Sequence, residues 1–287
     1  MPDGSGRARE ADEELRLVRS NDSGEFMTQA TSPAITTDGV TIHHESRGAG
    51  ADVILIHGLT DSSATWGPIV DMLAASYRVT TLDLRGHGRS GDSGDYHAVG
   101  MARDVAAVVG AAGIAAPLVI GHSLGGIVAT AYAAVGPARA VINVDQTLEL
   151  GAFQDGLRAV EALLRDPVSF PEILAAIFGS MDGDVLSEDA KAQIASHRRP
   201  TQAVVLGVWD EVMKSSIPEL EVAMRLVTST VAAPYLSLQF VEGADVYGEW
   251  LRVLLPQAVV EQWPGLGHYG HLVQADRFVE RVINFDK

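Results

Sequence analysis

The stretch that decides the fold is LVIGHSLGGIVATAYAAV, residues 118–135. Residues 118–120 form a short apolar run typical of a buried strand, and residues 123–135 have the length and Ala-rich composition of a helix. Between them lies GHSLG, a G-x-S-x-G motif at residues 121–125. A serine on such a sharp strand-to-helix turn has its hydroxyl above the sheet edge, next to the backbone donors of the helix N-terminus. The pattern therefore predicts a nucleophile at Ser123, against the alternative of a chance serine between glycines.

Other short apolar runs alternate with helical stretches on both sides of this motif. A hairpin with a tight Asp-Gly turn is expected over residues 34–45. Alternation of this kind predicts an α/β fold with a mostly parallel, doubly wound sheet. The remaining strands are expected at residues 53–56, 78–82, 141–144, 235–241 and 259–263, and the helices at residues 62–76, 95–113 and the C-terminus.

The regular alternation stops between residues 148 and 230. Two capping boxes, Ser169 with Glu172 and Ser216 with Glu219, mark helix starts there. We therefore predict a helical insertion over residues 148–230, within a core made of residues 31–147 and 231–287. Residues 1–30 are polar and have no sustained period, so we expect a disordered tail.

Composition excludes several classes of function. The formal net charge is −16, which argues against nucleic acid and anionic membranes as partners. The chain contains no cysteine, so a thiol nucleophile and thiolate metal sites are ruled out. The histidines show no metal-ligand spacing, and no apolar stretch is long enough for a membrane span. We expect a cytoplasmic protein with no metal, no cofactor and a small-molecule substrate, and the sequence predicts no particular oligomeric state.

Four motifs in this order resemble the α/β-hydrolase family. They are IHGL at residues 56–59, DLRGHGRS at 83–90, GHSLG at 121–125 and GLGH at 265–268. The resemblance spans roughly residues 34–287 and implies a serine esterase or lactonase with a helical cap. It also implies that the backbone N–H groups of Leu59 and Leu124 form the oxyanion hole.

The resemblance assigns the general base to His268, which follows the last predicted strand in a Gly-flanked turn. A serine hydroxyl needs such a base because it is hardly ionised at neutral pH. His271 is the competitor, although a position at the start of the terminal helix favours a packing role for it.

The acid that orients His268 has two candidates. The chain order Ser, acid, His of this fold favours Asp245, just beyond the strand predicted at residues 235–241. The family more often places the acid three residues after the glycine, where this chain has Val246. Asp145, which ends the strand at residues 141–144, is the alternative acid.

The resemblance makes the insertion a cap that closes over Ser123. As a group its apolar residues predict an uncharged pocket, although a helix–helix core is the better explanation for any single one of them. The substrate-binding candidates are Phe178, Trp209 and Met213.

Together these features predict a serine hydrolase that cleaves a small, largely apolar ester, thioester or lactone through an acyl-enzyme. One alternative is a carbon–carbon bond hydrolase or a cofactor-free peroxidase or lyase on the same fold. Another is a small-ligand sensor or signalling protein that retains the triad.

Overall fold

The computed structural model describes residues 34–36, 38–182, 185–241 and 243–287. The tail predicted over residues 1–30 lies outside the described residues. No helix in these ranges is both long and apolar enough to cross a membrane.

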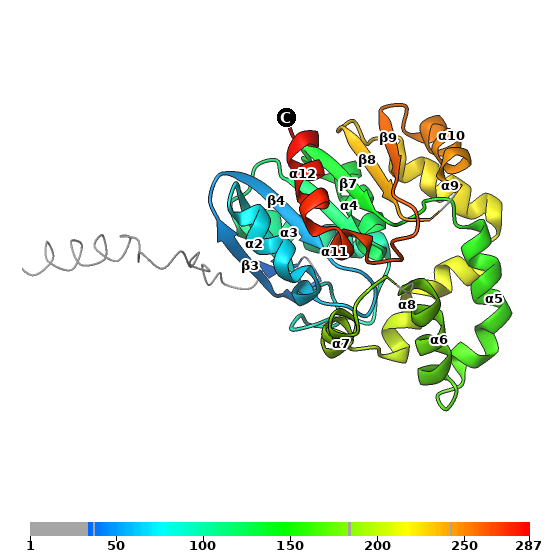
Figure 1. Ribbon diagram of the computed structural model, residues 1–287. Helices are drawn as coiled ribbons and strands as arrows, with labels where there is room; N and C mark the ends of the chain where they lie inside the picture. The colour runs from blue at the N-terminus through cyan, green and yellow to red at the C-terminus, as the bar shows by residue number, and fades with distance from the viewer. Residues whose placement is uncertain (1–33, 37, 183–184, 242) are drawn as a thin grey trace, which may run out of the picture.

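A seven-stranded sheet forms the centre of the molecule (Figure 1). Its first strand pairs antiparallel with its neighbour, and all other pairings are parallel. The predicted mostly parallel α/β sheet is therefore confirmed. In spatial order the strands are β3 (His44–Gly48), β5 (Tyr77–Leu82), β4 (Ala51–Ile56), β6 (Leu118–His122), β7 (Ala140–Val144), β8 (Tyr235–Gln239) and β9 (Ala258–Gln262).

The N-terminal hairpin does not join this sheet as one unit. β1 (Ala34–Ile35) and β2 (Thr41–Ile42) form a separate antiparallel pair. The chain then enters the main sheet with β3, which pairs with β5.

Helices cover both faces of the sheet, which explains the unbroken apolar strands. In β4, Val53 and Leu55 pack into one core, whereas Ile54 and Ile56 pack into another. The first core contains residues of α2 (Gly67–Ala74) and α12 (Ala275–Phe285). The second contains residues of α3 (Ala98–Ala111), α4 (Leu124–Val135) and α10 (Ala244–Leu254).

Among the described residues between β7 and β8 there are five helices, and we call them the helical insertion. They are α5 (Gly151–Arg165), α6 (Phe170–Asp182), α7 (Glu188–His197), α8 (Gln202–Lys214) and α9 (Ile217–Thr228). Figure 1 shows α6, α7 and α8 together beyond one end of the sheet.

One of the two predicted capping boxes forms. At α9, Glu219 accepts a hydrogen bond from the Ser216 backbone N–H at 2.7 Å, and the Ser216 hydroxyl accepts one from the Glu219 N–H. At α6, Ser169 instead donates its hydroxyl to Asp166 at 2.6 Å.

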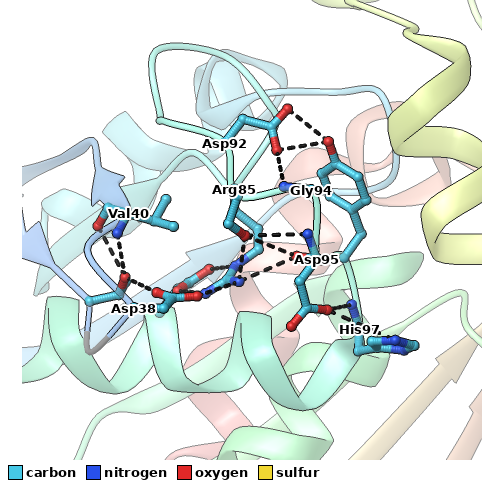
Figure 2. A network of polar contacts seen from close by, with 11 residues as sticks. Asp38, Val40, Arg85, Asp92, Gly94, Asp95 and His97 are labelled. Carbon is cyan, nitrogen blue, oxygen red and sulfur yellow. Dashed lines mark hydrogen bonds and ion pairs between the residues drawn. The ribbon is translucent and has the colours of Figure 1, made fainter.

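A buried ion pair anchors the loop that follows β5. The Arg85 guanidinium donates two 2.6 Å hydrogen bonds to Asp104 of α3, and both side chains are buried. It also reaches Asp38 at 2.9 Å and the Asp95 carbonyl at 3.3 Å, so one cation joins the N-terminal hairpin to this loop (Figure 2). Within the DLRGHGRS motif, Asp83 accepts from the Arg89 N–H at 2.9 Å and the Ser90 hydroxyl donates to the Asp83 carbonyl at 2.5 Å. The motif therefore closes a turn after β5.

Candidate active site

Ser123 occupies a strained turn between β6 and α4. Its φ and ψ are 53° and −127°, a conformation that is rare for a residue with a side chain. Two glycines make the turn possible. A Cβ atom at Gly121 would lie 1.9 Å from the Gly125 carbonyl oxygen, and one at Gly125 would lie 2.3 Å from the Ile56 carbonyl oxygen. The motif is therefore a structural requirement of the serine's position.

The loop after β4 packs directly against this serine. An added Cβ atom at Gly58 would lie 3.1 Å from the Ser123 Cβ atom. Leu59 follows Gly58 in the loop, and Leu124 is the first residue of α4, where a helix leaves its N–H groups without intrahelical partners. Leu59 and Leu124 are therefore the next residues after Gly58 and Ser123, the two positions that pack together here.

His57 is part of the same loop but serves its shape. Its Nδ1 donates to the Gly58 carbonyl at 2.7 Å, and its Nε2 accepts from the Leu84 N–H at 3.0 Å. Burial lowers the pKa of His57 to about 3. The ring is therefore neutral and ties the loop after β4 to the loop after β5.

His268 lies in the turn between β9 and α11 (Gly270–Val273) and is buried. Its Nδ1 is 2.7 Å from Asp145 Oδ2, and the side chains are 6% and 8% exposed. Its backbone carbonyl accepts a 2.8 Å hydrogen bond from Nε2 of His122, the residue before Ser123. Two motifs that lie far apart in the sequence thus meet at one place.

The carboxylate that meets His268 belongs to Asp145, the alternative acid. The expected pairing with Asp245 is not formed, because Asp245 lies exposed in the first turn of α10. Asp145 has a φ of 52° at the end of β7. Its Oδ1 accepts from the Phe240 N–H at 2.8 Å, and its own N–H donates to the Leu238 carbonyl at 2.7 Å. These bonds hold the carboxylate at the edge of the sheet, facing His268.

His271, the competing base, is packed among aromatic rings. Its ring centroid is 5.1 Å from that of Trp66 and 5.7 Å from that of Phe278. Burial lowers the pKa of His271 to about 3. Burial also lowers the pKa of His122 well below its ordinary value. Both histidines are therefore neutral packing groups around His268.

Asp61, Tyr269 and Arg198 form a buried polar cluster beside this site that the sequence did not predict. Asp61 lies in the loop after β4, Tyr269 follows His268, and Arg198 is the C-cap residue just after α7. The Tyr269 hydroxyl donates to Asp61 at 2.8 Å and accepts from Arg198 at 2.7 Å. Burial is the main cause that raises the pKa of Asp61, and Arg198 opposes it. Nothing in the spacing of these residues indicates that they meet.

The three expected substrate-binding residues are all buried in the insertion. Phe178 lies next to the polar cluster, with the Arg198 guanidinium 4.5 Å from its ring centroid. Trp209 packs edge-on against Phe153, with ring centroids 5.9 Å apart. Met213 lies one turn further along α8, on the same buried face.

Comparison with known proteins places this chain among hydrolases. The alpha/beta hydrolase family matches residues 53–281. The 2-(acetamidomethylene)succinate hydrolase of Mesorhizobium japonicum is 24% identical over 258 residues, which cover 86% of this chain and 91% of the relative.

A second relative is the pimeloyl-acyl-carrier protein methyl ester esterase of Aliivibrio salmonicida. It is 38% identical over 102 residues, which cover 34% of this chain and 36% of the esterase. The chain spans about a third of the length of the first curated relatives that it matches, namely 37%, 33% and 36%.

Among solved structures, the enol-lactonase of Burkholderia xenovorans has the same fold. The two structures superpose with a TM-score of 0.68 at 18% sequence identity, and the alignment covers 88% of this chain and 98% of the lactonase.

Proposed function

The chain belongs to the alpha/beta hydrolase family, and we propose that it is a serine hydrolase that cleaves a small, largely apolar ester, thioester or lactone. The observation that carries this proposal is the 2.7 Å contact of His268 Nδ1 with Asp145 Oδ2. A 2.8 Å hydrogen bond joins His268 to His122, the residue before Ser123 in the strained strand-to-helix turn. A carboxylate at Nδ1 holds the imidazole in the tautomer whose Nε2 accepts a proton. In this tautomer Nε2 can accept the proton of the Ser123 hydroxyl.

In the first half of the reaction, Ser123 Oγ attacks the carbonyl carbon while His268 Nε2 takes the hydroxyl proton. The Asp145 carboxylate stabilises the imidazolium that results. The N–H groups of Leu59 and Leu124 donate to the oxyanion, and each such donor is typically worth about 3 to 4 kcal/mol of barrier. The tetrahedral intermediate then collapses, His268 returns the proton to the leaving group, and an acyl-enzyme remains.

In the second half, water takes the place of the serine hydroxyl. His268 accepts a proton from the water as it attacks the acyl carbonyl, and the same two amides bind the second oxyanion. Collapse releases the acid, and the proton on His268 returns to Ser123 Oγ. Water is consumed, one acyl bond is cleaved, and the enzyme is regenerated.

The side chains of the helical insertion favour an apolar substrate. Phe178, Trp209 and Met213 are buried side chains without charge. The cation beside Phe178 belongs to Arg198, which is ion-paired with Asp61 at 3.4 Å. We infer that the insertion acts as a cap and presents apolar surface to the acyl group.

Hydrolysis of p-nitrophenyl butyrate by the wild type and by Ser123→Ala tests this proposal. We expect turnover by the wild type and a loss of at least a thousandfold in the variant, since the alanine carries no nucleophile. Thermal unfolding checks that the variant is folded. A folded Ser123→Ala protein with undiminished turnover would contradict the proposal.

A further inference from the structure

The helical insertion places one cation beside the catalytic loops. Arg198 has a side chain only 15% exposed, and its Nε lies 3.4 Å from Oδ1 of Asp61, which is 1% exposed. The Tyr269 hydroxyl lies between them, as donor to Asp61 and acceptor from Arg198. An aspartate this deeply buried needs a partner, because an unpaired buried charge is strongly unfavourable.

Asp61 lies close to the position where negative charge develops during catalysis. A Cβ atom added to Gly58 would lie 3.4 Å from Asp61 Oδ2 and 3.1 Å from the Ser123 Cβ atom. Gly58 therefore separates the carboxylate from the serine. The proposed oxyanion donor Leu59 is two residues before Asp61 in the same loop. A carboxylate here that is not neutralised repels the oxyanion and slows the reaction. For unit charges roughly 7 Å apart at an effective dielectric of 20, the repulsion lowers the rate about 50-fold.

Arg198 is held in place by the docking of the insertion on both catalytic loops. The Arg199 N–H donates to the Thr60 carbonyl at 2.9 Å, and the His268 N–H donates to the Met181 carbonyl at 2.8 Å. The guanidinium also lies over the Phe178 and Tyr269 rings, with centroids at 4.5 and 5.5 Å. A shift of the insertion away from these loops therefore moves the cation away from Asp61.

We propose that Arg198 is a positioning residue that neutralises Asp61 beside the oxyanion hole, so that acyl transfer at Ser123 is fast only while the helical insertion is docked. The inference rests on the proposed serine hydrolase function. Arg198 acts through Asp61 and does not itself contact the reacting carbonyl.

The test compares Arg198→Gln with wild type on p-nitrophenyl butyrate, a neutral ester that offers Arg198 no charge to bind. Burial raises the pKa of Asp61, so the assay is run at pH 8.5 to keep the carboxylate ionised. We expect kcat to fall about 50-fold with KM within threefold of wild type. Adding Asp61→Asn to this variant removes the repelling charge and restores kcat at least tenfold.

Two further variants make the test specific to the charge. Arg198→Lys keeps a cation and is expected to lose less than fivefold in kcat. Arg199→Gln is the matched control, because that exposed guanidinium donates to backbone carbonyls at the C-terminal end of α7, those of Ser196 and Arg198. We expect less than a twofold change for it. Thermal unfolding is measured for each variant.

Several results would overturn the inference. One is wild-type kcat in a folded Arg198→Gln protein. A second is a double variant as slow as the single one, and a third is a loss confined to KM. If Arg198→Gln does not fold, Asp61→Asn alone decides, because a loss of more than tenfold in that folded variant contradicts the neutralising role. Failure of Ser123→Ala to abolish turnover refutes the proposed function instead, whatever the Arg198 variants do.

Discussion

Replacement of Asp145 by asparagine removes the negative charge next to His268 and keeps the shape of the side chain. The two side chains are nearly fully buried, and His268 Nδ1 lies 2.7 Å from Asp145 Oδ2. An asparagine presents either a carbonyl, which gives no charge stabilisation, or an amide N–H, which favours the wrong imidazole tautomer. Both outcomes weaken the base at the moment when it takes the serine proton.

The size of the loss follows from this geometry. The imidazolium and the carboxylate have charge centres roughly 4 Å apart, which at an effective dielectric of 20 corresponds to about 4 kcal/mol. That energy equals about a thousandfold in rate, and loss of the correct tautomer adds up to about another tenfold. We therefore expect kcat to fall by about 10³ to 10⁴ in Asp145→Asn.

Asp245→Asn is the matched control, because it makes the same chemical change at the exposed start of α10. Steady-state hydrolysis of p-nitrophenyl butyrate at pH 8 compares the two variants with wild type. We expect Asp245→Asn to stay within twofold of wild type. The reasoning is refuted if Asp245→Asn loses a thousandfold while a folded Asp145→Asn protein keeps its activity.

Two further predictions concern stability. Gly125→Ala places a Cβ atom 2.3 Å from the Ile56 carbonyl oxygen, so we expect urea denaturation to show a loss of about 3 kcal/mol in the free energy of unfolding. A Cβ atom at Gly110 in α3 meets no other atom within 4 Å, so Gly110→Ala should raise the free energy of unfolding by up to about 1 kcal/mol. Equal effects at the two glycines would contradict the packing argument. Burial lowers the pKa of His271 to about 3 in the folded state. Between about pH 6.5 and pH 3 this histidine therefore binds a proton only in the unfolded state, so acid favours unfolding. The free energy of unfolding should therefore fall less steeply between pH 6 and pH 4 in His271→Phe than in wild type, by about 1.4 kcal/mol per pH unit. Urea denaturation at each pH measures this slope. An unchanged slope would show that His271 is not the group responsible.

The parts of the site that the sequence predicts are those with local signals. Ser123 is recognised because strand, turn, glycines and helix all lie within one short stretch. The two-faced burial of β4 also follows directly from its unbroken apolar run. Such features depend on neighbours in the chain, and a single sequence contains them in full.

The acid was harder to predict because its role depends on contacts between distant segments. Both acids satisfy the chain order Ser, acid, His, and Asp245 is expected because it follows the strand predicted at residues 235–241. The contact instead requires a carboxylate at the end of β7, next to β6 in the sheet. Asp145 reaches His268 across 123 residues, with the support of the Phe240 N–H. The positive φ of Asp145, which is part of this geometry, leaves no trace in the residue types around it.

Arg198 shows the same limit more strongly. It meets Asp61 across 137 residues, and only the packing of α7 against the loop after β4 brings them together. Among the charged residues of the insertion it has no distinguishing spacing. For this reason the sequence predicted an uncharged pocket and did not indicate that Arg198 lies beside the site.

The central claim is that Ser123 is a nucleophile activated by His268. Reaction of the folded protein with a fluorophosphonate probe, followed by mass analysis of its peptides, tests it most directly. We predict one adduct per chain on Ser123, no adduct in Ser123→Ala, and labelling at least a hundredfold slower in His268→Ala. An adduct at another residue, or labelling of His268→Ala at the wild-type rate, would contradict the claim.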